Sequence, residues 1–334
     1  MRAAVLTAAN QPLKYVSNYP IPKPLPNQIL VKVSACGVCR TDLHVYDGDL
    51  TSPKLPLILG HEIVGRVVTS GAESKKFKAG DRIGTGWLAH VDGSCRYCKR
   101  NQENLCDHAV FTGYTRDGGF AEYCVVDEEF AEALPPSFDD VHAAPLMCAG
   151  LIGFRTYKMT DLLSVPDQAI GIYGFGAAAH ICAQLAPVFK HRVFAFTRPG
   201  DTSAQEFARS LGCEYAGDSS KRSPEPLDAA LIFAAVGDLV VNALENVRKG
   251  GIVVCGGIHM SDIPSFPYAS LWGERTIKSV ANLKKDDLKD FLNAAALAPH
   301  LTTAVTPFPL EQAQDAIEAL KAGKVNGAAV ITMD

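Results

Sequence analysis

The first 130 residues alternate short apolar runs with polar and proline-rich segments. Apolar runs at 3–6, 29–33 and 63–68 have the length and composition of β-strands. The prolines between 20 and 26 cannot donate to a strand ladder, so they indicate a loop or a sheet edge. We therefore expect a mainly β N-terminal part.

From about residue 150 the pattern changes to buried apolar runs that alternate with helical segments. This alternation predicts a parallel, doubly wound sheet of the Rossmann type, which binds its ligand at the carboxyl ends of the strands. Pro187 should end or kink the first helix of this part. Strands are expected at 169–173, 192–196, 229–234 and 251–255, and a helix at 203–211.

The last fifty residues return to mixed elements. Residues 285–292 place charges on one face of an amphipathic helix. A second helix is expected at 310–322, followed by a strand at 327–331.

Length and charge narrow the classes of function. The 334 residues suffice for two domains with their own cores. Basic and acidic residues nearly balance, 32 against 36, and no basic stripe follows the sequence, so nucleic acid is not an expected partner. No apolar run is long enough to span a membrane or to form a signal peptide, so we expect a cytoplasmic protein without a membrane partner.

Potential metal ligands are concentrated between Cys36 and Glu62. Cys39 and His61 combine thiolate and imidazole, the ligand mix that suits Zn²⁺. Asp42 and Glu62 are carboxylates that could orient the imidazole or complete the coordination.

A second ligand series follows on a segment expected to be a loop. Asp92, Cys95, Cys98 and Cys106 have the close spacing that lets side chains converge on one tetrahedral ion. We predict a structural zinc site in which Asp92 supplies a carboxylate oxygen.

A glycine turn follows the first predicted strand of the second half. Gly174 and Gly176 would allow the tight turn and a close approach of the backbone, and the helix from Ala177 would direct its N-terminus at a pyrophosphate. The context of strand, turn and helix predicts a dinucleotide site.

Together these motifs resemble the zinc-dependent medium-chain alcohol dehydrogenases of the medium-chain dehydrogenase/reductase superfamily, and the resemblance covers essentially the whole chain. It implies a GroES-like catalytic domain, residues 1–147 and 283–334, with the tail folded back onto it. Residues 148–282 would form the Rossmann cofactor domain. Two zinc ions per chain, NAD(P) and a homo-oligomer, either a dimer or a tetramer, are implied as well.

The resemblance also assigns the catalytic zinc. Cys148 matches the third protein ligand beside Cys39 and His61, which leaves one position open for substrate. Asp42 would orient the His61 ring, and Glu62 would lie behind the metal.

Further roles follow from the resemblance alone. Thr41 and His44 match a relay that carries the proton of the alcohol through the nicotinamide ribose to water. Arg40 would contact the cofactor pyrophosphate. Leu50 and Trp87 match positions that line the substrate pocket, and Leu50 leaves space for primary alcohols of medium length, aliphatic or benzylic.

The choice of cofactor depends on the end of the strand at 192–196. Relatives specific for NAD carry an Asp there, whereas this chain has Thr197 followed by Arg198. A hydroxyl and a guanidinium can both contact a 2′-phosphate, so we expect NADP to be accepted and slightly favoured.

Two other classes of protein remain open from the sequence. One is another oxidoreductase on the same scaffold, a polyol dehydrogenase or a quinone reductase. The other is a non-catalytic, zinc-stabilised protein similar to a lens crystallin. Cys39, His61 and Cys148 argue against the first, and Thr41 and His44 argue against the second.

Overall fold

The computed structural model describes residues 1–258, 260–325 and 327–333. Within them the chain forms two compact units. The first comprises Met1–Ala149, Asn282–Leu292 and Thr302–Asp334, and the second Gly150–Ala281 and Asn293–Leu301. The domain boundaries expected from the sequence, 1–147 with 283–334 and 148–282, stay a prediction; in the structure residues 293–301 cluster with the second unit.

The first unit is built on a mostly antiparallel sheet around β3 (Gln28–Val38), most of which is buried. β5 (Glu62–Ser70) pairs with it on one side, and β18 (Ala328–Thr332) and β9 (Tyr123–Asp127) also pair with it. The remaining strands of the unit are β1 (Ala3–Leu6), β2 (Lys14–Val16), β4 (Leu57–Ile58), β6 (Arg82–Thr85), β7 (Leu88–His90), β8 (Val110–Phe111), β10 (Ala131–Ala133) and β17 (Val305–Pro309).

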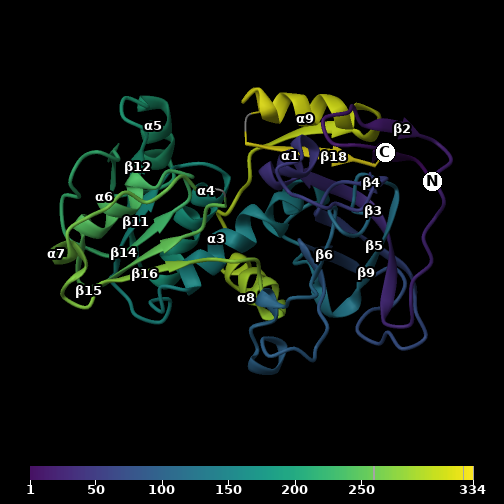
Figure 1. Cartoon of the computed structure of the whole chain (residues 1–334), viewed down its shortest axis with the longest axis horizontal. Helices are drawn as coiled ribbons and strands as arrows, with labels where there is room; N and C mark the ends of the chain where they lie inside the picture. Colours follow the sequence, from purple (N-terminus) through teal and green to yellow (C-terminus); the bar gives the residue numbers. More distant parts are fainter. Residues whose placement is uncertain (259, 326, 334) are drawn as a thin grey trace. The chain divides into compact units, whose positions relative to one another are not determined.

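Helices are short and few in the described part of this unit. α1 (Arg40–Asp47) directly follows β3, and α9 (Ala313–Lys321) lies along β17 and β18 (Figure 1). A 3₁₀ turn at Leu310–Gln312 precedes α9, so the helix expected at 310–322 is interrupted near its start. α2 (Asp140–Ala143) is a single turn, and α8 (Lys285–Ala296) begins in this unit and ends in the second.

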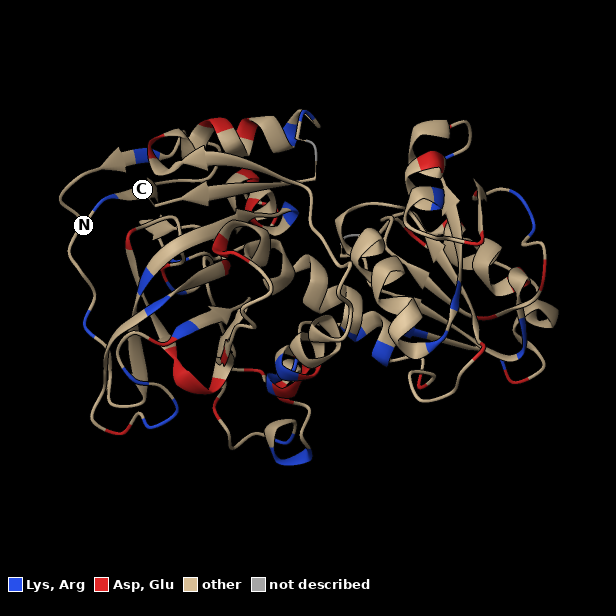
Figure 2. Ribbon diagram, turned by 180° about the vertical axis from the view of Figure 1, so that it is seen from behind, with Lys and Arg blue, Asp and Glu red and all other residues tan. Residues whose placement is uncertain are grey.

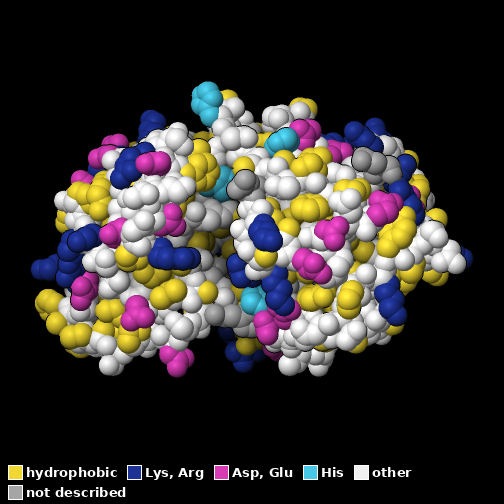
Figure 3. All heavy atoms as spheres, turned by 90° about the horizontal axis from the view of Figure 1, so that it is seen from above, with side chains coloured by type: hydrophobic (Ala, Val, Ile, Leu, Met, Phe, Trp, Pro, Cys, Tyr) yellow, Lys and Arg dark blue, Asp and Glu magenta, His cyan; other side chains and the backbone are white. Residues whose placement is uncertain are grey.

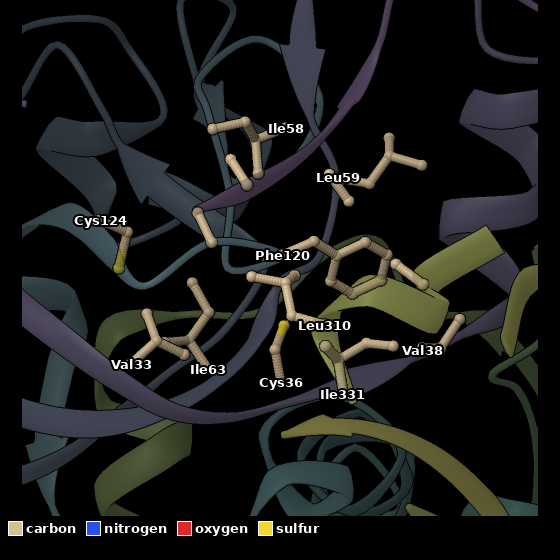
Figure 4. Packing of buried hydrophobic residues seen from close by; sticks show 14 of the residues in the cluster. Val33, Cys36, Val38, Ile58, Leu59, Ile63, Phe120, Cys124, Leu310 and Ile331 are labelled. Carbon is tan, nitrogen blue, oxygen red and sulfur yellow. The ribbon is translucent and has the colours of Figure 1, made fainter. Parts of the chain in front are cut away.

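One apolar cluster fills the space beneath the first sheet. Its side chains come from strands and from segments far apart in sequence, as Figure 4 shows. Burial of such side chains supplies roughly 1.5–3 kcal/mol each, which holds the ends of β3 and β5 in place. The labelled members are Val33, Cys36, Val38, Ile58, Leu59, Ile63, Phe120, Cys124, Leu310 and Ile331.

The second unit contains the expected parallel sheet, in the order β13-β12-β11-β14-β15-β16 (Figure 1). All of its strand pairs are parallel, and the central strands are buried runs of apolar residues, as sheets covered on both faces require. The strands are β11 (Ala169–Tyr173), β12 (Arg192–Thr197), β13 (Tyr215–Asp218), β14 (Leu227–Ile232), β15 (Val247–Cys255) and β16 (Thr276–Ser279). β13 and β16 were not predicted.

The helices of the second unit follow the expected alternation. α4 (Ala177–Leu185) ends two residues before Pro187, and a 3₁₀ turn at Ala186–Phe189 takes over, because proline cannot continue the hydrogen-bond ladder. The remaining helices are α3 (Ala149–Lys158), α5 (Thr202–Ser210), α6 (Asp238–Asn246) and α7 (Tyr268–Leu271).

Basic and acidic side chains are intermixed, and neither sign is concentrated in one of the two units. Figure 2 shows basic and acidic residues scattered over both units, and on the face presented in Figure 3 they alternate with small hydrophobic patches. Among the described residues no helix is both long and apolar enough to cross a bilayer.

Candidate functional site

Cys39 lies at the junction of β3 and α1. Its backbone is extended, and its Sγ accepts a hydrogen bond from Thr41 N at 3.3 Å. Asp42 Oδ2 accepts from Cys39 N at 2.9 Å, which completes a capping box at the start of α1. The helix cap therefore fixes the position of the thiol.

His61 directly follows Gly60, whose backbone conformation only glycine readily adopts. Gly60 has φ +94°, and a Cβ there would lie 2.4 Å from the Phe120 ring. Asp42 Oδ1 accepts from Gly60 N at 3.0 Å and lies 3.3 Å from His61 Nδ1. One buried carboxylate thus holds both the Cys39 cap and the His61 ring.

Glu62 begins β5 and is also buried. Gly37 lies opposite it on β3, and a Cβ at Gly37 would come within 1.8 Å of Glu62 Oε2. The glycine at position 37 therefore makes the space that the carboxylate occupies, a requirement that the sequence analysis missed.

Cys148 completes the cluster from the end of a 3₁₀ turn, Ala144–Met147. Its Sγ lies 3.7 Å from Cys39 Sγ. One ligand atom each from Cys39, His61, Glu62 and Cys148 lies within 4.8 Å of the others. His61 Nε2 and Glu62 Oε2 are buried without a hydrogen-bond partner, although buried polar atoms are normally paired.

The pKa values of the groups in this cluster are shifted by burial and by their neighbours. The hydrogen bond between the two sulfurs lowers the pKa of Cys39 and raises that of Cys148, while burial raises the pKa of Glu62 well above its usual range. Burial acts to lower the pKa of His61, but the charges of Asp42 and Cys39 outweigh it and raise it. Two thiols, an imidazole nitrogen without a partner and a buried carboxylate fit a zinc ion.

The residues expected in the proton relay lie on α1. His44 Nδ1 lies 2.8 Å from Asp49 Oδ2, a pairing that was not anticipated. Thr41 is half-buried one turn before His44, and Arg40 is exposed as the first residue of the helix. Their assigned roles remain predictions.

One aromatic ring contacts the imidazole, and two further rings stack on that one. The Trp87 ring meets His61 edge-on at 5.1 Å between centroids and stacks on Phe111 and Tyr114. The Tyr114 hydroxyl donates to the carbonyl oxygen of Thr51. Leu50 and Trp87, the two residues expected in the substrate pocket, are half-buried and pack against the same apolar cluster. Phe111 and Tyr114, which stack on Trp87, were not predicted.

The second ligand series also converges. Ligand atoms of Asp92, Cys95, Cys98 and Cys106 lie within 4.8 Å of one another. Asp92 Oδ1 accepts from the backbone N–H groups of Ser94 and Cys95 at 2.8 and 2.9 Å, and the bond from Cys95 is the main reason that its pKa is lowered. The turn thus presents an ionised carboxylate to three thiols, a donor set that zinc accepts.

His108 was not identified from the sequence. Its Nδ1 lies 2.8 Å from Asp92 Oδ2, while 76% of its side chain is exposed. The contact raises the pKa of His108 and would orient the carboxylate. A histidine two residues after the last cysteine was the signal available in the sequence.

The glycine turn of the second unit has the expected geometry. Gly174 has φ +84°, and a Cβ there would lie 2.7 Å from that of Ala234. A Cβ at Gly176 would meet no atom within 4 Å, and no side chain caps the N-terminus of α4, which begins at Ala177. This open helix end can accept a pyrophosphate.

Thr197 and Arg198 differ in whether their side chains are free to contact a cofactor. The Thr197 side chain is 2% exposed, and its hydroxyl lies 3.2 Å from Arg198 O, 3.5 Å from Gly217 O and 3.1 Å from Gln205 Nε2. The predicted contact of this hydroxyl with a 2′-phosphate would require it to leave these partners. Arg198 is exposed, and within the described chain it forms no ion pair.

Comparisons with known proteins place the chain in a family. Residues 25–136 match the family described as the alcohol dehydrogenase GroES-like domain. A probable alcohol dehydrogenase of Mycobacterium tuberculosis is 44% identical over 317 residues, which cover 93% of this chain and 90% of the relative. An alcohol dehydrogenase of Geobacillus stearothermophilus is 33% identical and covers 100% of this chain and 99% of its own.

Solved structures agree with this assignment. A cinnamyl alcohol dehydrogenase from Sorghum bicolor matches with a TM-score of 0.87 and 25% identity, covering 99% of this chain and 97% of that one. The chain therefore belongs to the alcohol dehydrogenase family of the medium-chain dehydrogenase/reductase superfamily. It is an oxidoreductase, and the relatives support alcohol dehydrogenase activity.

Proposed function

We propose that the protein is a zinc-dependent alcohol dehydrogenase that oxidises primary alcohols of medium length, aliphatic or benzylic, reversibly to aldehydes with NAD(P). The observation that carries this proposal is the buried cluster of Cys39, His61 and Cys148, in which His61 Nε2 lacks a partner. A zinc ion bound there would act as a Lewis acid on the alcohol oxygen. The nicotinamide would accept the hydride.

The chain's own residues prepare this chemistry. Asp42 holds the His61 ring through Nδ1, which leaves Nε2, buried and without a hydrogen-bond partner, as the nitrogen that would bind the metal. The carboxyl group of Glu62 lies in the same cluster, beside the position that the metal would occupy. Thr41 would receive the proton of the alcohol, and His44, oriented by Asp49, would pass it to solvent.

A substrate screen tests the activity. C2 to C8 primary alcohols, benzylic alcohols and the corresponding aldehydes would be assayed with NAD and with NADP. Polyols and quinones would be included, because turnover of those compounds alone would favour another oxidoreductase of the superfamily. Absence of turnover with every compound in a zinc-replete protein would contradict the proposal and favour a non-catalytic role.

The substrate pocket supports a preference for longer alcohols. We expect kcat/KM to rise by about fourfold per methylene until the pocket is full, because each buried methylene contributes about 0.8 kcal/mol. The half-buried Leu50 and the stacked ring of Trp87 supply apolar surface, and the similar Sorghum protein is named for an aromatic alcohol. Steady-state kinetics over the C2 to C8 series measures the trend.

A variant with a smaller substrate pocket tests the same preference. Leu50→Trp should move the optimum toward short alcohols, whereas the same exchange at the exposed Leu25 should leave it in place. A wild-type specificity constant that is highest for ethanol would refute the preference.

Cofactor binding is proposed at the glycine turn, with Gly174, Gly176 and Ala177 around the pyrophosphate and Arg40 as a further contact. Both NAD and NADP would be used, with NADP slightly favoured through Arg198. We expect Arg198→Ala to weaken NADPH binding by about ten- to a hundredfold and to leave NADH nearly unchanged, since a charge-assisted hydrogen bond is worth roughly 1.5–3 kcal/mol.

Fluorescence titration with both reduced cofactors measures the effect of Arg198→Ala. Lys249→Ala removes an exposed cation elsewhere in the second unit and should alter neither affinity. Equal losses for both cofactors in the Arg198 variant would show that the side chain does not contact the 2′-phosphate.

Several further properties belong to this proposal. We expect two zinc ions per chain, one in each cluster, and a homo-oligomer, either a dimer or a tetramer, which light scattering would measure. A cytoplasmic location fits five clustered cysteines that must stay reduced to bind metal, and cell fractionation would test it.

A further inference from the structure

Asp218 ends β13 beside the end of β12. The two strands are parallel, and Asp218 is the Cα partner of Thr197. Neighbouring strands lie about 4.8 Å apart, so both residues reach the same carboxyl edge of the sheet. In doubly wound sheets this edge receives the dinucleotide, and an acid near the end of the second strand holds the ribose hydroxyls. Here the acid stands on the adjacent strand.

One oxygen of Asp218 anchors the loop that carries Arg198. Oδ1 accepts from Gly200 N at 3.0 Å and from Gln205 Nε2 at 2.9 Å. Gln205 Nε2 also contacts the Thr197 hydroxyl at 3.1 Å. Through these contacts the Thr197 hydroxyl is hydrogen-bonded to Gln205, and the backbone at Gly200, two residues after Arg198, is held in place.

The second oxygen of Asp218 is available. Within the part of the chain that the structure describes, Oδ2 has no hydrogen-bond or ion-pair partner, and the side chain is half-buried. An aspartate carries negative charge at neutral pH and only accepts hydrogen bonds. It can therefore accept from a ribose hydroxyl, whereas it repels a phosphate in the same place.

We propose that Asp218 is a second cofactor-selectivity residue, which accepts a hydrogen bond from the 2′-hydroxyl of NAD and opposes the 2′-phosphate of NADP. The inference rests on the proposed function, in that this edge binds NAD(P). Arg198 attracts the phosphate and Asp218 repels it, so the two side chains offset each other and keep the preference for NADP small. A repulsive group of this kind is a common source of specificity.

Asp218→Asn isolates the charge, because the amide retains an oxygen that can accept from Gly200 N and Gln205 Nε2. We expect NADPH to bind about tenfold more tightly and NADH no more tightly than in the wild type. Titration of the zinc-loaded protein with NADPH and NADH measures the ratio of the two dissociation constants. Asp218→Ser, which is also neutral, provides the same measurement if the asparagine variant does not fold.

Gln205→Ala is the control for loop anchoring, since it removes a contact of Asp218 Oδ1 without removing the charge. It should change both affinities in the same direction and leave their ratio near that of the wild type. An unchanged ratio in both neutral variants of Asp218, or an equal change of ratio in Gln205→Ala, would overturn the proposal.

Arg198→Ala separates this failure from failure of the proposed cofactor site. If Arg198→Ala weakens NADPH alone while the neutral variants of Asp218 change nothing, the cofactor site stands and only the role of Asp218 is lost. If neither residue affects either cofactor, this edge does not bind the adenosine ribose, and the proposed cofactor site fails.

Discussion

Replacing Cys39 with alanine should abolish turnover and remove one zinc ion per chain while leaving the fold intact. Cys39 lies at the junction of β3 and α1, and the pairing of β3 with β5 does not depend on its side chain. The loss of kcat/KM should be about a thousandfold or more, since Lewis-acid stabilisation contributes several kcal/mol to the transition state. Steady-state kinetics, metal analysis and circular dichroism measure the three effects.

Cys124→Ala is the matched control. Cys124 is another buried thiol of the first unit and belongs to neither ligand cluster. Its loss should cost some stability but neither zinc nor activity. A Cys39→Ala protein that keeps both zinc ions and most of its activity would refute the assignment of the catalytic site.

Asp92→Ala should lower the zinc content from two to one per chain and reduce the unfolding temperature by about 10 °C, because a structural zinc stabilises only the folded loop. Both carboxylate oxygens of Asp92 are held by the loop and by His108, so the ligand is fixed before metal binds. The chemical step should change little, because the four residues of this cluster are distinct from those around Cys39. Metal analysis and thermal unfolding test the prediction.

Asp107→Ala provides the comparison within the same loop. Asp107 is exposed, follows Cys106 directly and is absent from the ligand cluster. Its removal should change neither metal content nor stability. A native zinc content of one per chain would contradict the role of Asp92 directly.

Local spacing was sufficient to predict much of the site. The candidate ligands Asp92, Cys95 and Cys98 follow one another at intervals of three residues, so their convergence requires little more than a tight loop. Gly174 could be predicted in the same way, because a strand followed by a tight turn and a helix is a local pattern.

Other features depend on the register of strands that are distant in sequence. The need for Gly37 appears only when β3 and β5 pair, which places Glu62 against it. Cys148 lies more than a hundred residues from Cys39, and only the resemblance to a family identified it from the sequence. The strand β13, with the sequence Tyr-Ala-Gly-Asp, was missed because it is only four residues long and three of them, Ala, Gly and Asp, are depleted in strands.

The sequence by itself determined the alternation of elements, the ligand series that begins at Asp92 and the glycine turn, because each is encoded by residues close together in the chain. Only the tertiary structure decided which side chains remain free to contact a cofactor. It buried the hydroxyl of Thr197, left Arg198 exposed and brought Asp218 to the same edge of the sheet. Availability depends on hydrogen bonds and burial between neighbouring strands, and these are set by packing rather than by local residue type.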